Sequence, residues 1–525
     1  MFVRSRFDRR SFLKSSAATG LVAASSLFMP ALSRAQSRPR FTHGVQSGDV
    51  DASSGMVWVR ADRPARLEFE WATTESFKEP TRLHGLDATP NRDLAVKRLL
   101  TGLPSDQEIF WRSRATDLTD GNARSDWITG HFRTAPTERR TVRFAWSGDT
   151  AGQGWGIDES RGGMKTYASM NNHDLDFFIH SGDTIYADGP IEERVDLEDG
   201  GTWKNIVTPE KSKVAETLDE YRGQWKYNLL DENLKALNAF VPTFFQWDDH
   251  EVVNNWSSSK DLTGDDRYRV KDVMLLASRA GQAFHEMTPI RYQPEEPGRV
   301  YRTIHYGPLV DIFFLDLRSY RSGNSVGLQE TRSDETRILG DRQIAWLKTA
   351  LTRSTATWKV IASDMPIGLQ VWDNQGDERF VEAIANGDAG SPKGRELEIA
   401  EILRFIKAEG VLNTVWLTAD VHYTAAHHYS PDRAAFQDFE PFREFVSGPI
   451  HSGTFGPNDL DATFGPQVRF VKAPEDGRVN LPPSEGLQFF GLVEIDGDSE
   501  ALTVRLMDRD DNELWTTTLE PQHAA

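Results

Sequence analysis

The chain has 525 residues, a formal net charge of −19 at pH 7 and no cysteine. Its length predicts two or three domains, and its 38% hydrophobic residues, with 15 Trp, fit a folded protein with a large core. The acidic charge argues against nucleic acid and anionic lipid headgroups as partners. Without cysteine the chain can form no disulfide, zinc finger, iron–sulfur cluster or catalytic thiolate, so any metal must be held by oxygen and imidazole.

The N-terminus has the pattern of a twin-arginine signal peptide. Arg9-Arg10-Ser11-Phe12-Leu13-Lys14 precedes a mildly apolar run from Ala17 to Leu32, and Ser33-Arg34-Ala35 offers the small residues that a signal peptidase reads. A membrane anchor is the alternative, but the run is short and interrupted by Thr, Gly, Ser and Pro, and no later stretch could span a bilayer. We therefore expect residues 1–35 to direct export by the twin-arginine machinery, to the periplasm or the medium, with no transmembrane anchor after processing.

Residues 36–137 are predicted to form an N-terminal β-sandwich. Ser54–Val59 is a short apolar run, and Leu67, Phe69 and Trp71 alternate with polar residues, which is typical of a half-buried strand. We expect about seven short strands here, separated by turn-forming residues and without any helical period. This module carries no chemistry of its own and is expected to pack beside the main domain.

Residues 138–525 alternate strands with helices, which predicts a layered α/β domain. The charged segment 187–240 is expected to be helical and to form a cap over the site, and the last three strands are expected to be antiparallel. The predicted strands are Val142–Trp146, Phe177–His180, Thr243–Trp247, Leu309–Asp316, Trp358–Ala362, Thr414–Leu417, Leu487–Ile495, Leu502–Met507 and Glu513–Leu519. The predicted helices are Lys165–Asn171, Glu216–Tyr227, Asp272–Phe284, Asp341–Leu351 and Glu396–Ala408.

Four of these strands end in polar loops. In open α/β sheets, ligands bind outside the carboxyl ends of the strands. One acidic loop at such an end is common, whereas four of them, two with histidine, favour a metal site. The loops contribute Asp149, then Asp183, Tyr186 and Asp188, then Asp248, Asp249, His250 and Glu251, and finally Asp420 and His422.

This set of side chains suits the hydrolysis of a phosphate ester. Two metal ions can neutralise charge on the phosphoryl oxygens, activate water and stabilise the leaving oxygen, and such a pair needs a carboxylate that bridges both ions. Oxygen ligands suit calcium, magnesium, manganese or ferric iron, and imidazole favours the transition metals. A phenolate from Tyr186 would favour ferric iron.

Each residue also has a purely structural interpretation. Asp149 and Asp183 could cap helices, and Asp249 with His250 could form an ion-paired turn. Asp420 and His422 lie two positions apart, so on an extended segment they point to the same side and could share a ligand. The later His427 and His428 are expected to be structural.

With these residues the chain resembles the alkaline phosphatase D (PhoD-like) family. The resemblance lies in Phe177–Asp188, Trp247–Asn255 and Thr418–His422, together with Gly44–Asp49 at the start of the strand module and the twin-arginine signal, and it covers nearly the whole mature chain. It implies a four-layer calcineurin-like metallophosphoesterase domain, hydrolysis of small phosphate monoesters and diesters, and an iron and calcium centre.

The resemblance also implies roles for individual residues. Asp183 would be the bridging carboxylate, Tyr186 the ferric ligand and Asp249 a ligand of the second metal. His250 would contact the phosphate or act as general acid, and Asp420 and His422 would complete the two metal sites.

One position departs from the family. Its iron site generally has a cysteine just after the first strand, and Asp149 stands at that place here. A carboxylate is a harder ligand than a thiolate, so manganese or zinc is open beside iron and calcium. Asp364, after the fifth strand, is a further possible ligand, and Asn254 is another possible contributor.

The sequence is compatible with three functions. The favoured one is an exported alkaline phosphatase and phosphodiesterase that releases phosphate for scavenging by metal-activated water. The second is a phosphodiesterase of phospholipase D type on the same scaffold. The third is a non-catalytic protein that binds calcium or a glycan, which the intact His250 and His422 disfavour.

Overall fold

The computed structural model describes residues 38–375 and 378–523. The expected signal peptide, residues 1–35, lies outside the described residues. In the part of the chain that the structure describes, no helix has both the length and the apolar character needed to cross a membrane.

The N-terminal module consists of two antiparallel sheets, as the sequence predicted. Alternate residues of the long strand β6 are buried, including Ile109, Trp111 and Ala115, and they share one apolar core with Val45 and Val57 of the other sheet. In hydrogen-bonding order the sheets are β1 (Phe41–Gly48), β2 (Ser54–Ala61) and β5 (Ala95–Thr101), and β4 (Thr81–Ala88), β3 (Ala65–Ala72), β6 (Glu108–Asp117) and β7 (Ile128–Arg133).

The main domain is built on two larger mixed sheets. The first has the order β12 (Thr243–Phe245), β9 (Phe177–His180), β8 (Val142–Ser147), β22 (Phe489–Ile495), β23 (Leu502–Asp508) and β24 (Glu513–Leu519). The second has the order β13 (Arg302–His305), β14 (Val310–Phe314), β15 (Trp358–Ala362), β18 (Thr414–Thr418), β20 (Phe442–Val446), β19 (Thr424–Tyr429) and β21 (Pro466–Lys472). The expected antiparallel arrangement of the last three strands is confirmed.

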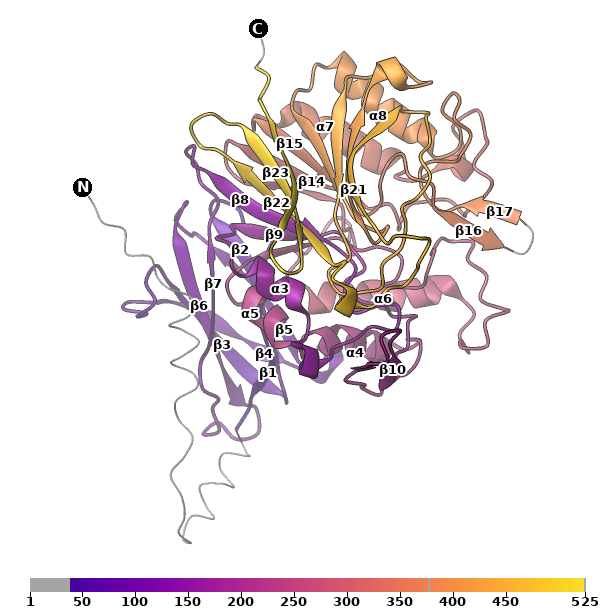
Figure 1. Ribbon diagram of the computed structural model, residues 1–525. Coiled ribbons are helices and arrows are strands. Elements are labelled where there is room, and N and C mark those ends of the chain that lie inside the picture. Colours follow the sequence, from indigo (N-terminus) through magenta and orange to yellow (C-terminus); the bar gives the residue numbers. More distant parts are fainter. Residues whose placement is uncertain (1–37, 376–377, 524–525) are drawn as a thin grey trace.

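Two layers of helices cover the outer faces of these sheets (Figure 1). On the first sheet lie α3 (Lys165–Met170), α4 (Leu218–Asn228), α5 (Glu232–Asn238) and α6 (Val273–Met287). On the second lie α7 (Asp341–Arg353) and α8 (Glu396–Ala408). Short 3-10 turns are η1 (Pro90–Arg92), η2 (Glu159–Arg161), η3 (Asp334–Thr336), η4 (Pro431–Arg433) and η5 (Pro483–Glu485).

The alternation of side chains along the strands explains the four layers. In β8, Phe144 and Trp146 enter the core between the sheets, whereas Ala145 faces the helix side. In β18, Leu417 enters the same central core, whereas Trp416 packs with the residues of α7 and α8. Because successive strand residues point to opposite faces, an unbroken apolar strand buries both faces, which requires a covering layer on each side.

The segment 187–240 differs from the helical cap that was expected. Residues 194–204 form a hairpin of β10 (Arg194–Asp196) and β11 (Thr202–Lys204), and helix appears only in α4 and α5. The hairpin turns at Asp199-Gly200-Gly201, where Gly200 has a φ of +81° and the Gly201 N–H donates to the Asp199 carboxylate at 2.7 Å. The two helices belong to the layer on the first sheet, since their buried residues pack into its core.

The N-terminal module packs against the main domain through apolar and polar contacts. Most of its buried apolar residues belong to the same apolar cluster as those between the two large sheets, whereas Trp58 and Ala95 pack with the helices on the first sheet. Arg302 of β13 forms a buried ion pair with Asp49 at 2.7 Å, and the Trp58 indole donates to the Glu286 carbonyl at 2.8 Å. One continuous core therefore holds the strand ends of the main domain in place.

Candidate metal centre

Four of the predicted site residues lie in strained backbone at the strand ends. Asp149 follows β8, Asp183 follows β9, and Asp420 and His422 follow β18, with φ angles of +66°, +49°, +66° and +60°. Non-glycine residues rarely adopt this left-handed region, and such strain is concentrated at functional sites. The loops thus present these side chains at the same edge of the two sheets.

The first group of ligand atoms belongs to Asp149, Asp183 and His422, whose atoms lie within 4.8 Å of one another. Both Asp149 oxygens are buried and have no hydrogen-bond partner among the described residues. A buried carboxylate without a partner is costly, and a cation would supply what it lacks. Tyr186 adds a fourth candidate ligand atom, because its hydroxyl oxygen lies 2.9 Å from His422 Nε2.

Two further groups of candidate ligand atoms lie beside the first. Asp183, Asp249 and His250 form one, and Asp248, Asp249 and Asp420 form the other, each again within 4.8 Å. Asp183 is common to the first two groups, as a bridging carboxylate must be. The structure therefore brings together all seven residues that the sequence analysis selected: Asp149, Asp183, Tyr186, Asp249, His250, Asp420 and His422.

His422 is oriented for ligation through one nitrogen. Its Nδ1 lies 2.5 Å from the Gly453 carbonyl and 3.0 Å from Ser452 Oγ, so Nδ1 carries the proton and Nε2 faces the Tyr186 hydroxyl. Burial lowers the pKa of His422 to about 4, so the imidazole is neutral at pH 7, and its Nε2 lone pair, which faces the Tyr186 hydroxyl, can bind an ion.

His250 is held differently. Its Nδ1 lies 2.7 Å from Asp188 Oδ1, and its ring is tilted by 32° against that of Tyr186, with 4.3 Å between the ring centroids. Burial alone would lower the pKa of His250, but the Asp188 and Asp249 carboxylates outweigh it and raise that pKa to about 9. The protonated ring thus keeps its Nε2 for the site.

Glu251 joins two of the strand-end loops. It is buried, and its carboxylate accepts the N–H groups of Asp183 at 3.1 Å, Thr184 at 2.6 Å and Asp248 at 2.8 Å. These charge-assisted bonds fix the loop after β9 against the loop after β12. The position of the shared Asp183 is set in this way.

The carboxylates of the centre repel one another. Burial, with Asp248 and Asp249, raises the pKa of Asp149 well above its usual range, and burial with the same neighbours does so for Asp183 and Asp420. Bound cations would relieve this repulsion and keep the carboxylates ionised. The donor set therefore fits metal ions.

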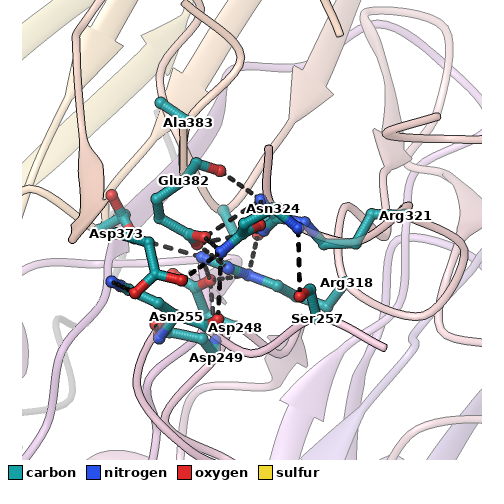
Figure 2. Close-up of polar contacts among 12 residues, drawn as sticks. Asp248, Asp249, Asn255, Ser257, Arg318, Arg321, Asn324, Asp373, Glu382 and Ala383 are labelled. Carbon is teal, nitrogen blue, oxygen red and sulfur yellow. Dashed lines mark hydrogen bonds and ion pairs between the residues drawn. The ribbon is translucent and has the colours of Figure 1, made fainter. Parts of the chain in front are cut away.

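Beside this centre, Arg318 is completely buried and neutralises a second group of acids (Figure 2). It forms ion pairs with Asp248 and Glu382, and it lies 3.3 Å from Asp364 and 3.5 Å from Asp420. The planar guanidinium suits several carboxylates at once. Asp364, a possible ligand from the sequence, lies in this ion-pair cluster and in none of the three ligand groups.

A polar network extends from this cluster to the hairpin of β16 (Trp372–Gln375) and β17 (Glu378–Val381). Asn324 donates to Asp373 and Glu382 at 3.0 Å each, and Asn255 donates to Asp373 at 3.1 Å (Figure 2). The backbone N–H of Asn255 in turn donates to Asp249. The network thus holds the Asp249 carboxylate, a candidate metal ligand, in position.

Several of these residues were not selected from the sequence. Asp188 was noted in a strand-end loop but given no role. Arg318 was missed, and so was Arg321, which pairs with Glu382 at 3.1 Å. Their signal was a pair of arginines directly after the predicted strand that ends at Asp316.

The undecided residues are also placed. His427 pairs with Glu444 at 3.2 Å within the second sheet, as expected of a structural histidine. Asn254 contributes its backbone N–H to Asp188 at 2.9 Å, whereas its side chain is exposed.

The comparison with known families is decisive. A family model described as PhoD-like phosphatase matches residues 144–506, and one described as its N-terminal domain matches residues 24–136. The chain belongs to the PhoD-like phosphatase family. As a member it is a metal-dependent phosphoric ester hydrolase.

Individual relatives agree with this placement. The chain is 29% identical to alkaline phosphatase D of Bacillus subtilis (strain 168) over 482 residues, which is 87% of this chain and 78% of the relative. The solved structure of PhoD superposes with a TM-score of 0.66 at 22% identity, covering 92% of this chain and 94% of the other. Purple acid phosphatase PPD1 from yellow lupin seeds has a TM-score of 0.55 at 12% identity, covering 92% and 74%. The two structures confirm the predicted fold class.

Proposed function

We propose that this PhoD-like phosphatase is an exported enzyme that hydrolyses small phosphate monoesters and diesters with two or more metal ions held between the strand-end loops. The observation that carries the proposal is the position of Asp183, which is shared by two groups of ligand atoms beside the unpartnered carboxylate of Asp149. When bound, such ions supply positive charge at the phosphoryl oxygens and an activated water.

Asp149, Asp183, Tyr186 and His422 are proposed to hold the first ion. This set of two carboxylates, a phenol and an imidazole favours ferric iron, which the family resemblance also implies, and leaves manganese or zinc as alternatives. Burial and the Asp183 carboxylate raise the pKa of Tyr186 well above its usual range, so ligation requires a strongly polarising cation that displaces the phenol proton.

Asp183, Asp249 and Asp420 are proposed to hold the second ion. All three offer carboxylate oxygens, which suits calcium, the metal implied by the resemblance. Asp249 and Asp420 lie in one ligand group with Asp248, but Asp248 is engaged by Arg318. We therefore assign Asp248 to the ion-pair cluster.

His250 is proposed to be the general acid or phosphate contact. Asp188 holds the proton at Nδ1, and Nε2 remains free to donate to a phosphoryl or leaving oxygen. His250 also lies in a ligand group with Asp183 and Asp249, so direct ligation is the competing role. Unchanged metal content with lost turnover in His250→Gln would favour the acid, whereas loss of one ion would favour ligation.

The export part of the proposal rests on residues 1–35 and their twin-arginine motif. Replacement of Arg9 and Arg10 by lysine should retain the precursor inside the cell while its catalytic activity in lysates persists. Continued export of that variant would contradict the twin-arginine route.

Substrate choice is tested by comparing three compounds on one preparation. Turnover of an aryl phosphate monoester and a bis-aryl diester, without release of choline from phosphatidylcholine, is the expected pattern. Preferred hydrolysis of phosphatidylcholine would replace the proposal by the phospholipase D-type alternative. The segment 187–217, which reaches the site at Asp188, is proposed to form the cap that governs this choice.

A further inference from the structure

A cationic cavity of about 290 Å³ is lined by none of the residues assigned to the metal centre. Arg161, Lys165 and Arg509 contribute to its lining, and no carboxylate does. Such a concentration of positive charge is unusual in a chain whose formal net charge is −19. The cavity is therefore electrostatically opposite to its surroundings and suits an anion.

Two buried polar atoms of the lining residues, Arg509 Nε and Gln488 Oε1, have no hydrogen-bond partner among the described residues. The Arg509 side chain is only 15% exposed; it forms a long ion pair with Asp510 at 3.6 Å and donates through Nη2 to the Ser484 carbonyl at 3.4 Å. Lys165 forms no ion pair with any described carboxylate. Arg161 lies 3.6 Å from Asp158, whose carboxylate already accepts N–H groups from Ser160 and Lys204.

Gln488 adds an acceptor to these donors. Its side chain is fully buried in the lining, and its Oε1 has no hydrogen-bond partner among the described residues. Three cations with one acceptor match a phosphate group, whose oxygens accept from the cations and whose P–OH donates to the amide. A fully deprotonated sulfate would leave Gln488 Oε1 without a partner.

The cavity shares a wall with the metal centre. The His451 side chain lines the cavity, while the backbone of His451 bonds to Asp149 and Ala151 at 3.1 and 2.8 Å. The next two residues, Ser452 and Gly453, are the partners of His422 Nδ1. A movement of residues 451–453 on one side would therefore shift a candidate metal ligand on the other.

We propose that this cavity is a second anion site that binds a phosphate group, as inorganic phosphate or as a phosphate monoester, and that its occupancy alters the metal centre through residues 451–453. The binding step stands independently of catalysis. The coupling step rests on the proposed role of His422, and its test is kept separate.

Calorimetric titration of the metal-loaded enzyme tests the binding step. Inorganic phosphate and phenylphosphonate, a monoester analogue that is not hydrolysed, are each titrated into the wild type, Lys165→Gln, Arg509→Gln and the control Arg505→Gln. Arg505 pairs with Glu513 on the neighbouring strand and does not line the cavity. Lys165 is exposed, so its replacement does not disturb folding.

Two classes of phosphate site are expected in the wild type and in Arg505→Gln. One class should weaken at least about tenfold in Lys165→Gln and Arg509→Gln, since each loses a charge-assisted contact. Binding of inorganic phosphate to that class identifies free phosphate as the ligand, and binding of phenylphosphonate alone identifies an ester. A single class in the wild type, or two unchanged classes in both cavity variants, would overturn the proposal.

The coupling step is tested by inhibition kinetics. Phosphate should inhibit the wild type in a mixed pattern, because it binds both the active site and the cavity. In Lys165→Gln the pattern should become purely competitive, with kcat and KM unchanged in the absence of phosphate. Purely competitive inhibition of the wild type, or an unchanged mixed pattern in the variant, would contradict coupling even where binding is confirmed.

Discussion

Around Arg318, buried carboxylates are neutralised by the chain's own guanidinium groups, whereas around Asp149 they are not. Asp248 and Glu382 pair directly with Arg318, while both oxygens of Asp149 have no hydrogen-bond partner among the described residues, and their nearest ion-pair partner there, His422 Nε2, is 4.0 Å away. The two clusters lie side by side, since Asp420 contacts both. The difference indicates which half of the acidic site is complete on its own and which half requires ions from solution.

The largest loss of activity is expected at Asp149, the buried carboxylate without a hydrogen-bond partner. Asp149→Asn should lower kcat/KM by about 10³-fold or more, because a weakened metal site forfeits several kcal/mol of transition-state stabilisation. The same change should raise the Tm of the metal-free protein, since it removes a carboxylate whose pKa burial and its neighbours raise. Kinetics and thermal unfolding after chelation measure both. A metal-free variant less stable than the wild type would contradict this view of Asp149.

Removal of Arg318 should lower the stability of the metal-free protein, whereas removal of the Asp149 charge should raise it. Arg318→Met leaves several buried carboxylates uncompensated and should lower the free energy of unfolding by about 3–5 kcal/mol. The matched control is Arg404→Met, whose solvent-exposed ion pair with Asp438 at 2.9 Å should contribute far less to stability. Denaturant unfolding of metal-free protein compares them. Equal losses in the two variants would remove the distinction between the clusters.

The Asp188–His250 pair provides a pH-dependent prediction. His250 is active as an acid below its pKa, which Asp188 helps to raise to about 9. Asp188→Asn should therefore lower that pKa and move the alkaline limb of the kcat profile to lower pH, with activity at the wild-type optimum reduced about 10–100-fold. The pH–rate profiles of the two proteins measure the shift. An alkaline limb that stays in place would show that His250 is not the titrating group.

A smaller effect is expected from crowding the unpartnered carboxylate. A Cβ at Gly448 would lie 2.1 Å from Asp149 Oδ2, so Gly448→Ala should displace that oxygen and lower kcat/KM about tenfold. Gly121→Ala is the control, because a Cβ there meets no atom within 4 Å. Initial rates at several metal concentrations measure the effect. Equal activity of both variants would show that a small displacement of the Asp149 carboxylate does not affect catalysis.

Much of the fold followed from local patterns. Apolar strands such as Val142–Ser147 bury both faces, which predicts a sheet covered on both sides. The glycines before Asp149 and Asp183 are typical of turns at the strand ends. The strand-end pattern selected Tyr186 and Asp249 as metal-site candidates, and the family resemblance added which of the two ions each would bind. The helix expected in the segment 187–240 is wrong for residues 187–217, where the turn at Asp199-Gly200-Gly201 joins β10 and β11 in a hairpin.

The sequence could not predict which side chains form ion pairs between residues that are far apart in the chain. Arg318 comes from the loop after β14 and meets Asp248 and Glu382, which are 70 and 64 positions away in the chain. The link from Asp188 to His250 likewise spans 62 positions. Whether a buried acid is satisfied by an arginine or left for a metal depends on these tertiary contacts, and no local pattern encodes them.

Elemental analysis of the enzyme and of Asp183→Asn, both purified after native export, tests the central claim most directly. The wild type should contain two or more metal ions per chain, and the variant should lose metal together with hydrolysis, because Asp183 is common to two ligand groups. Active wild-type enzyme without bound metal, or a variant with unchanged metal content, would contradict the claim that the acidic half of the site is completed by ions.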